Sequence, residues 1–280
     1  MRYLLYNPFS GEENFSYNSA VSYSETTDLP TDLIDITKLE SFRAFYENLE
    51  ANDDMVIFGG DGSLNKVANQ LFDLSLKNNM YYYPCGTGND FARDVGVTDG
   101  SELIYINDYI KKLPVVTING VESKFINGVG FGIDGYCCEV GDKLKSQHKK
   151  PNYTAIAISG LLFHFKPVNA TVTIDGQKTT FKKVWIAPTM FGRYYGGGMM
   201  PTPNQNRDDE SVSLMVFHGS SKLKTLMIFP SIFKGEHIKN KKYVTVLKGS
   251  DVTVEFDRPT ALQIDGETML NVSAYNVKSR

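Results

Sequence analysis

Hydrophobic positions in the first third of the chain alternate between the spacing of strands and the spacing of helices. The stretch "DMVIF" at 54–58 contains a continuous apolar run, as in strands that are covered on both faces, and 2–7 and 80–86 are further strand candidates. Between these runs, apolar residues recur at helical intervals over 39–49 and 64–71. This alternation predicts a parallel, layered α/β domain.

From about residue 114 the pattern changes to short stretches in which apolar and polar residues alternate. β-Branched residues are frequent there, and Asn-Gly and Asp-Gly pairs separate the stretches, which is typical of antiparallel hairpins. Helical spacing interrupts the pattern at 134–147 and 222–235. The sequence therefore predicts an α/β domain followed by a β-rich domain, with limits of 1–116 and 117–270 and with 271–280 as a candidate completion of the first domain.

The composition narrows the class of protein. Hydrophobic residues make up 41% of the 280 residues, which is enough for a core. The net charge of −3 argues against a nucleic-acid partner, because binding to phosphates requires an excess of positive charge. The three cysteines lack metal-ligand spacing and suit a reducing compartment. The apolar stretch 153–165 is shorter than the ~20 residues that span a bilayer, and the start lacks the apolar run of a signal peptide. We expect a cytoplasmic protein.

The stretch "FGGDGS" at 58–63 places glycines between an apolar strand and an amphipathic helix. Turns at the carboxyl ends of parallel strands are ligand sites, and backbone amides at a helix start suit phosphate. Asp61 would repel a phosphate unless a divalent metal bridged the two charges. The alternative interpretation is that Asp61 and Ser63 only cap the helix.

A second turn, "PCGTGNDFARDVG" at 84–96, repeats this design. It combines glycines with cap candidates, including Asn89 and Asp90, and opens a helix that carries Arg93. Two such turns after neighbouring strands predict one ligand held from two sides. The Walker A sequence and the protein-kinase signatures are absent.

Six motifs occur in order along nearly the whole chain: "NPFSG" at 7–11, "GGDGS" at 59–63, "GTGNDFAR" at 86–93, "NGVGFGIDG" at 127–135, "YYGGGMMPTP" at 194–203 and "IDGE" at 264–267. Together they resemble the diacylglycerol kinase catalytic family, which includes bacterial lipid kinases and is related to sphingosine and ceramide kinases. "GGDG" alone is weakly specific, because NAD kinases and phosphofructokinases share it. Its combination with "GTGNDFAR" is specific.

The resemblance implies two domains with a cleft between them. The first is a three-layer α/β nucleotide-binding domain of the phosphofructokinase and NAD-kinase type, and the second is a β-sandwich-like domain that completes the active site. The implied reaction transfers the γ-phosphate of ATP, with Mg²⁺, to a lipid hydroxyl, with diacylglycerol giving phosphatidic acid as the first candidate. The residues implied to bind ATP are Asn7, Gly59, Gly60, Asp61, Gly62, Ser63, Gly86, Thr87, Gly88 and Asn89. Asp61 is also an implied metal ligand.

Asp265 and Glu267 form the implied acidic pair at the reaction centre. In a strand, residues two apart point to one face, so the two carboxylates are expected to project together, and Gly266 leaves room for substrate. We expect Asp265 to act as the base and Glu267 to hold the metal, with the reverse assignment still open. The alternative is an Asp-Gly hairpin turn with solvated acids.

Three further acidic residues are weaker candidates. Asp134 matches an aspartate of the family and either supports the metal network or caps a helix. Asp208 and Asp209 lie where family members often carry a structural Mg²⁺ site, but Glu210 replaces the usual glycine, and a solvated acidic loop is an equal alternative.

Two basic stretches, 142–150 and 233–242, raise the question of membrane contact. They either bind anionic headgroups, giving peripheral contact with the inner membrane face where the lipid substrate resides, or form solvated helix faces. An exposed strand edge in the β-rich domain leaves a homodimer open.

Two departures from the family keep other functions open. Lys66 stands where many members have glutamate, and the segment after residue 11 lacks the usual basic residues. The alternatives are a kinase of a soluble substrate, such as NAD or a sugar phosphate, and a non-catalytic nucleotide- or lipid-binding relative.

Overall fold

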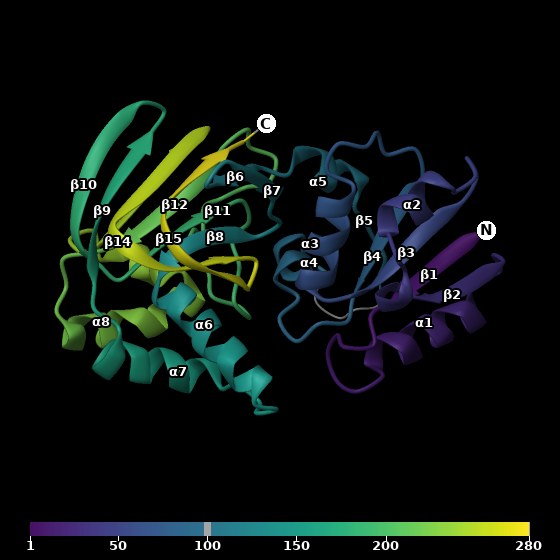
Figure 1. Cartoon of the computed structure of the whole chain (residues 1–280), viewed down its shortest axis with the longest axis horizontal. Helices are drawn as coiled ribbons and strands as arrows, with labels where there is room; N and C mark the ends of the chain where they lie inside the picture. The colour runs from purple at the N-terminus through teal and green to yellow at the C-terminus, as the bar shows by residue number, and fades with distance from the viewer. Residues whose placement is uncertain (98–101, 280) are drawn as a thin grey trace. The chain divides into compact units, whose positions relative to one another are not determined.

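The computed structural model describes residues 1–97 and 102–279, which divide into two compact units (Figure 1). The boundary falls between Leu113 and Pro114, three residues before the expected limit of the first domain. Among the described residues, no helix has the length and apolar character needed to cross a membrane.

The first unit is built around a five-stranded sheet with the order β2-β1-β3-β4-β5. The first four of these strands run parallel, and β5 is antiparallel to β4. Its strands are β1 (Arg2–Tyr6), β2 (Thr31–Asp35), β3 (Asp54–Gly59), β4 (Asn79–Pro84) and β5 (Ile104–Tyr105). Its helices are α1 (Phe15–Thr26), the 3₁₀ segment η1 (Ile36–Lys38), α2 (Phe42–Glu47), α3 (Asp61–Gln70), α4 (Asp90–Asp94) and α5 (Asn107–Lys112).

Helices cover both faces of this sheet, which gives the predicted three-layer α/β architecture (Figure 1). On one face, Ala20 of α1 packs against Leu4, Val56 and Phe58, all fully buried. On the other, α3 packs against β3 with its apolar stripe, in which Leu64, Val67 and Ala68 are buried. The helical spacing predicted for 64–71 therefore belongs to α3, which begins three residues earlier.

The second unit contains a ten-stranded antiparallel sheet system whose main path is β13-β12-β11-β8-β14-β15-β6-β7, with β9 and β10 attached to β14. Its strands are β6 (Val115–Ile118), β7 (Val121–Lys124), β8 (Gly128–Gly132), β9 (Val168–Ile174), β10 (Gln177–Val184), β11 (Ile186–Met190), β12 (Val212–Phe217), β13 (Val244–Gly249), β14 (Asp251–Ile264) and β15 (Glu267–Lys278). Its helical segments are α6 (Ile133–Ser146), α7 (Tyr153–Ser159), the π-helical η2 (Gly160–His164), α8 (Lys222–Ile228) and the 3₁₀ segments η3 (Phe229–Lys234) and η4 (Glu236–Lys239).

Strand β14 gives the second unit its sandwich-like form, because its first half pairs with β9 and its second half with β8. A core beneath α6, α7 and α8 includes the buried side chains of Ile133, Trp185 and Ile228. The helices that were predicted at 134–147 and 222–235 are therefore present, the second as α8 followed by η3.

Three two-residue turns with both φ angles positive close hairpins of this unit, as the Asn-Gly and Asp-Gly pairs predicted. They connect β6 to β7, β9 to β10, and β14 to β15. Of the segment 271–280 that was proposed to complete the first domain, residues 271–278 instead belong to β15, which pairs with β14 and β6. That expectation is corrected, because the backbone hydrogen bonds of this segment are made within the second sheet.

Candidate active site

Three loops of the first unit meet at the carboxyl ends of β1, β3 and β4, which are neighbours in the sheet. The first loop connects β1 to α1, the second connects β3 to α3 and includes the start of α3, and the third connects β4 to α4. The Asn7 side chain donates from Nδ2 to Ser63 Oγ at 2.8 Å. The buried Ser10 joins both loops, because its Oγ lies 3.2 Å from Ser63 Oγ and accepts from the Gly60 N–H at 3.3 Å. Ser10 was not singled out from the sequence, although it lies inside the first motif, "NPFSG".

The glycines of these loops serve two different purposes. A Cβ on Gly86 would lie 2.6 Å from Gly60 Cα, and a Cβ on Gly59 would lie 2.6 Å from Ser63 Cβ, so these positions are glycines because the chain packs against itself. A Cβ on Gly62 would meet nothing within 4 Å. The start of α3 therefore faces open space at Gly62, where another molecule can approach the backbone.

Asp61 connects the second and third loops. It is the first residue of α3, but its side chain caps the following helix, accepting from the backbone N–H of Asp90 at 2.9 Å and of Phe91 at 2.9 Å. The alternative interpretation, that Asp61 only caps its own helix, is therefore wrong. This bond network fixes the carboxylate beside the open start of α3.

The third loop is shaped by Asn89, which adopts a left-handed conformation with φ +49° and accepts from the Gly86 N–H at 2.8 Å. Thr87 at the tip of this loop is exposed, and Gly88 is partly exposed. All the residues that the sequence assigned to ATP therefore lie in the three loops that meet at the start of α3.

The second unit differs from expectation at the acidic pair. Asp265 and Gly266 are not strand residues but the two central residues of the turn between β14 and β15, with φ +47° and +89°. Positive φ at both positions reverses the chain, so the rule that places residues two apart on one face does not apply. Glu267 is the first residue of β15 and is exposed.

Nor does Asp265 correspond to the alternative of a solvated acid, because its carboxylate is bound by backbone amides. Its Oδ2 accepts from the N–H of Ile126 at 2.5 Å, and its Oδ1 accepts from Asn127 and Gly128 at 2.8 and 2.9 Å. In return, the Asp265 N–H donates to the Gly128 carbonyl at 3.0 Å. These bonds fix the hairpin end to residues 126–128.

Arg207, which sequence reasoning missed, binds this same segment. The guanidinium is buried and donates to the Ile126 carbonyl at 2.5 Å and to Asn127 Oδ1 at 2.7 Å. Arg207 and Asp265 therefore hold 126–128 from two directions. Because about 80 residues separate Arg207 from its partners, no local sequence pattern reveals the contact.

Asp134 is a buried acid next to Gln263, near the turn between β14 and β15. It is the second residue of α6 and not its N-cap, which is Gly132. Burial raises the pKa of Asp134 to about 7, although the Gly135 N–H opposes this by donating to Oδ1 at 2.9 Å. The Gln263 and Tyr195 side chains also lower this pKa, while Oδ2 is buried without a hydrogen-bond partner among the described residues.

Gln263 connects this buried acid to the turn, because its Oε1 accepts from the Gly266 N–H at 2.9 Å. Its Nε2 and the Tyr195 hydroxyl are also buried without partners among the described residues. The turn is therefore bonded to Gln263, whose amide lies near the buried side chains of Asp134 and Tyr195.

The acidic loop contains an ion pair. Asp209 Oδ2 lies 2.5 Å from Lys248 Nζ, and Asp208 is positioned by its N–H, which donates to Asn206 Oδ1 at 3.1 Å. Within residues 1–97 and 102–279, no three His, Cys, Asp or Glu side chains group closely enough to hold one metal ion.

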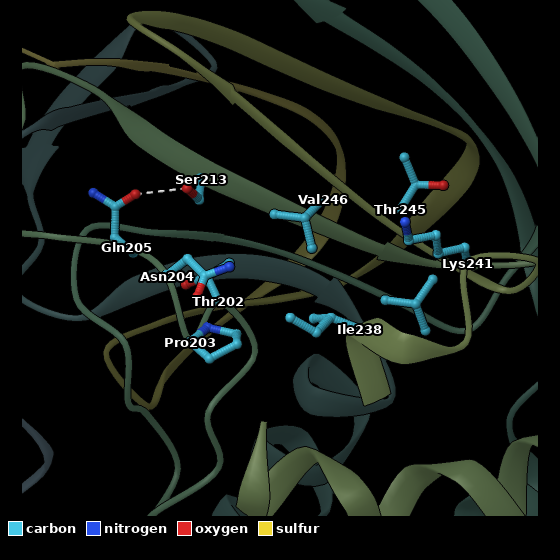
Figure 2. A pocket seen from close by; sticks show the side chains of 10 residues that line it. Thr202, Pro203, Asn204, Gln205, Ser213, Ile238, Lys241, Thr245 and Val246 are labelled. Atoms are coloured by element: carbon cyan, nitrogen blue, oxygen red, sulfur yellow. Dashed lines mark hydrogen bonds between the residues drawn. The ribbon is translucent and has the colours of Figure 1, made fainter. Parts of the chain in front are cut away.

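A cavity of about 360 Å³ opens elsewhere in the second unit (Figure 2). Its lining combines apolar side chains such as Ile238 and Val246 with polar ones such as Gln205 and Thr245. The Gln205 amide is already engaged, since its Oε1 accepts from Ser213 Oγ at 2.6 Å and its Nε2 donates to two carbonyls. None of the predicted site residues is among those that line this cavity.

Comparison with known proteins agrees with this arrangement of an α/β unit and a β-sandwich-like unit. Residues 2–116 match the family model described as the diacylglycerol kinase catalytic domain. Residues 127–277 match the model described as the YegS C-terminal NAD kinase beta sandwich-like domain. The chain belongs to the diacylglycerol kinase family, as the motifs predicted.

Individual relatives support the family assignment. A diacylglycerol kinase of Bacillus subtilis (strain 168) is 26% identical over 277 residues, covering 94% of this chain and 88% of the relative. A diacylglycerol kinase of Mycobacterium tuberculosis (strain ATCC 25618 / H37Rv) is 25% identical over 213 residues, covering 74% and 68%. The solved structure of a diacylglycerol kinase from Bacillus anthracis str. Sterne superposes with a TM-score of 0.64 at 19% identity, covering 99% of this chain and 93% of that one, which shows the shared fold.

Proposed function

We propose that this protein transfers the γ-phosphate of ATP to the hydroxyl of a membrane lipid, with diacylglycerol as the acceptor and phosphatidic acid as the product. The observation that carries the proposal is the meeting of three loops around the open start of α3, with Asp61 fixed between them. Membership of a kinase family supports the use of a nucleoside triphosphate, and the names of the relatives support the lipid acceptor.

The triphosphate binds at the start of α3 in this proposal. The first backbone N–H groups of a helix and its dipole attract phosphate, and the absence of a Cβ at Gly62 lets a phosphate approach closely. Asn7 and Ser63, already hydrogen-bonded to each other at 2.8 Å, set the shape of the loops that surround the phosphates.

The donor set fits Mg²⁺ with substrate phosphates. This ion commonly takes one or two protein carboxylates and completes its octahedron with phosphate oxygens and water. Each oxygen of Asp61 accepts one backbone N–H, which leaves lone pairs for a metal or its water. When bound, the ion would neutralise charge on the phosphates.

We assign the proton transfer to Glu267 and a positioning role to Asp265, whereas the first assignment from sequence made Asp265 the base and Glu267 the metal ligand. Three backbone N–H groups bind the Asp265 carboxylate and stabilise its charged form, so it is a poor group to accept a proton. Glu267 follows the turn directly and is exposed, so a substrate hydroxyl can reach it.

The proposal is tested by incubating the purified chain with labelled ATP and dispersed diacylglycerol, followed by identification of the labelled product. We expect labelled phosphatidic acid from the parent chain and none from Asp61→Ala, while circular dichroism shows the variant to be folded. Lys77→Ala, an exposed change outside the three loops, is the control and should leave the rate unchanged.

A soluble acceptor is the second candidate, because the matched model for residues 127–277 is described as NAD kinase-like. The same assay with NAD and sugar phosphates in place of lipid separates the two functions. Turnover of a soluble acceptor without lipid product would replace the lipid-kinase proposal, and tight ATP binding with no transfer to any acceptor would favour a non-catalytic relative.

A further inference from the structure

One side of the second unit exposes large apolar side chains on two neighbouring helical segments. Phe163 of η2 is 74% exposed, and Leu223 and Met227 of α8 are 70% and 67% exposed. Ile158 of α7 is also exposed. Figure 1 shows α7 and α8 along the same side of this unit, and the Lys222 Nζ donates to the Leu162 carbonyl at 2.9 Å, which joins the start of α8 to η2.

These apolar residues are separate from the core that the same segments supply. In η2 and the residue after it, Leu161 and Phe165 are buried while Phe163 points to solvent. In α8, Thr225 and Ile228 are buried. Leu223 and Met227 are four residues apart and therefore lie on one face of the helix. Each segment therefore has an inner face that stabilises the fold and an outer apolar face that does not.

The segments that carry this face, and the residues next to them in the chain, are rich in lysine. Residues 142–166 and 222–242 contain eleven lysines against two acids, Asp142 and Glu236, in a chain whose net charge is −3. Lys149 and Lys150 are exposed just before α7. Such concentrated positive charge beside exposed apolar side chains is complementary to an anionic bilayer surface, where apolar groups insert and lysines pair with headgroups.

A groove lies between the end of η2 and strands β14 and β15. It has a volume of about 360 Å³, and its lining includes His164 and Lys166 at the end of η2, Arg258 of β14 and Leu270 of β15. Arg258 donates to the Lys166 carbonyl at 2.6 Å, which fixes one wall of the groove. Leu270 lies three residues after Glu267 on the same strand, so one end of the groove is formed by the strand that also carries Glu267.

We propose that Ile158, Phe163, Leu223 and Met227, together with Lys149 and Lys150, form the docking surface by which this protein binds anionic phospholipid membranes. The proposal rests on the proposed lipid-kinase function for its purpose, but binding itself requires neither ATP nor catalysis. The apolar side chains enter the headgroup region of the bilayer, and the lysines add an electrostatic attraction that salt screens.

The test is cosedimentation of the full chain, without ATP, with vesicles of phosphatidylcholine alone or with about one third phosphatidylglycerol. We expect binding to the anionic vesicles, weakening as KCl rises from about 0.05 to 0.5 M. Phe163→Ser with Leu223→Ser, and separately Lys149→Glu with Lys150→Glu, should each lower the partition coefficient by roughly tenfold or more. Near-UV circular dichroism checks that these variants keep the packing of the parent.

Matched controls come from the β-hairpins of the same unit. Val121→Ser removes a side chain that is 70% exposed, and Lys178→Glu with Lys182→Glu reverses two exposed charges. Both should bind vesicles as the parent does. Equal binding to neutral and anionic vesicles, or equal losses in the control variants, would overturn the proposal. So would conversion of a dimer to a monomer by Phe163→Ser in sedimentation velocity, because a second copy would then cover the face.

Kinase assays distinguish failure of this proposal from failure of the proposed function. On a short-chain diacylglycerol that dissolves as monomers, the docking-surface variants should keep the parent rate, while on vesicles containing long-chain diacylglycerol they should lose it. Vesicle binding without activity on either substrate would retain the docking surface and reject the kinase assignment. Unchanged activity of the variants on vesicles would reject the docking surface and retain the kinase.

Discussion

The second unit contains two hairpin turns that are almost identical in sequence, "IDGQ" at 174–177 and "IDGE" at 264–267. Both aspartates have φ +47°, and the following glycines have φ +84° and +89°. In both turns, the aspartate carboxylate accepts three hydrogen bonds from a neighbouring segment. In both turns, therefore, the aspartate carboxylate fixes the hairpin end to a neighbouring segment by binding backbone N–H groups. Such binding is not in itself a sign of catalysis.

The differences between the two turns lie around the aspartates. The carboxylate of Asp175 is exposed and binds Ser250 and Asp251, whereas that of Asp265 is partly buried and binds the segment that Arg207 also holds. The residue after the glycine is Gln177 in one turn and Glu267 in the other. In the proposed function, proton transfer depends on this one difference, an amide in the first turn and a carboxylate in the second.

The largest expected effect is therefore from Glu267→Gln, which turns "IDGE" into "IDGQ". Loss of the group proposed to accept the substrate proton should lower kcat for lipid phosphorylation roughly 10²–10⁴-fold, with little change in stability because the residue is exposed. Gln177→Glu, which makes the reverse change, should leave kcat unaltered. A Glu267→Gln variant with nearly the parent kcat would show that Glu267 is not the proton acceptor and that the difference between the two turns is not catalytic.

The next effect concerns the buried acid under the 264–267 turn. The pKa of Asp134 is raised from its ordinary value of 3.8 to about 7 by burial, so the folded state binds a proton that the unfolded state releases. This contribution to stability is fully present below about pH 4 and is lost as pH rises through 7. At about 1.4 kcal/mol per pKa unit, the change amounts to roughly 4 kcal/mol.

Asp134→Asn should remove this dependence, so the thermal midpoint of the parent should fall relative to the variant between about pH 4 and 7 and stay level above that range. The difference between the two proteins isolates Asp134 from His218 and His237, whose pKa values burial lowers. Glu122→Gln, an exposed change of the same charge in β7, is the control and should parallel the parent. Parallel curves for Asp134→Asn and the parent would contradict a protonated Asp134 under the turn.

A smaller effect is expected from Asp265→Asn, which keeps the shape of the side chain but loses its charge. Weakening three hydrogen bonds to a charged, partly buried group should reduce the free energy of unfolding by about 1–3 kcal/mol. The matched change Asp175→Asn should destabilise less, because that carboxylate is exposed. Urea unfolding measures both.

Kinetics of these two variants test whether Asp265 positions or reacts. As a positioning residue, Asp265→Asn should lower kcat less than Glu267→Gln does and leave the pH profile of kcat unchanged. Asp175→Asn should leave kcat unchanged. If Asp265→Asn abolishes the pH dependence of kcat instead, Asp265 is the base, as the sequence first suggested.

The two turns also show how far sequence reasoning reaches. Local signals predicted the Asp-Gly hairpins, the apolar strands and the amphipathic α3, because turn chemistry and hydrophobic periodicity are encoded within a few residues. The partners of Asp265 lie 137 to 139 residues away along the chain, so no local pattern could reveal that its carboxylate is bound. The same separation hid Arg207.

Helix α1 was missed for a different physical reason. Its buried face consists of Ser16 and Ala20, four residues apart, so close packing of small side chains takes the place of an apolar stripe. Ser16 Oγ donates to the Asn7 carbonyl at 2.6 Å, which ties this helix to the first loop of the proposed ATP site. Hydrophobic periodicity has no signal for such a helix.

The smallest expected effect is the acid titration of Asp175. The N–H of Asp251 is the largest cause that lowers the pKa of Asp175, followed by the Ser250 side chain. A lowered pKa means that the carboxylate stabilises the fold above its ordinary pKa of 3.8, and this contribution is lost as pH falls through the lowered value. The parent and Asp175→Asn should therefore differ in urea midpoint near pH 6 and converge toward about pH 2. If the difference is the same at both pH values, the backbone donors do not recognise the charge of Asp175, and a common anchoring role for the two turns loses its electrostatic basis.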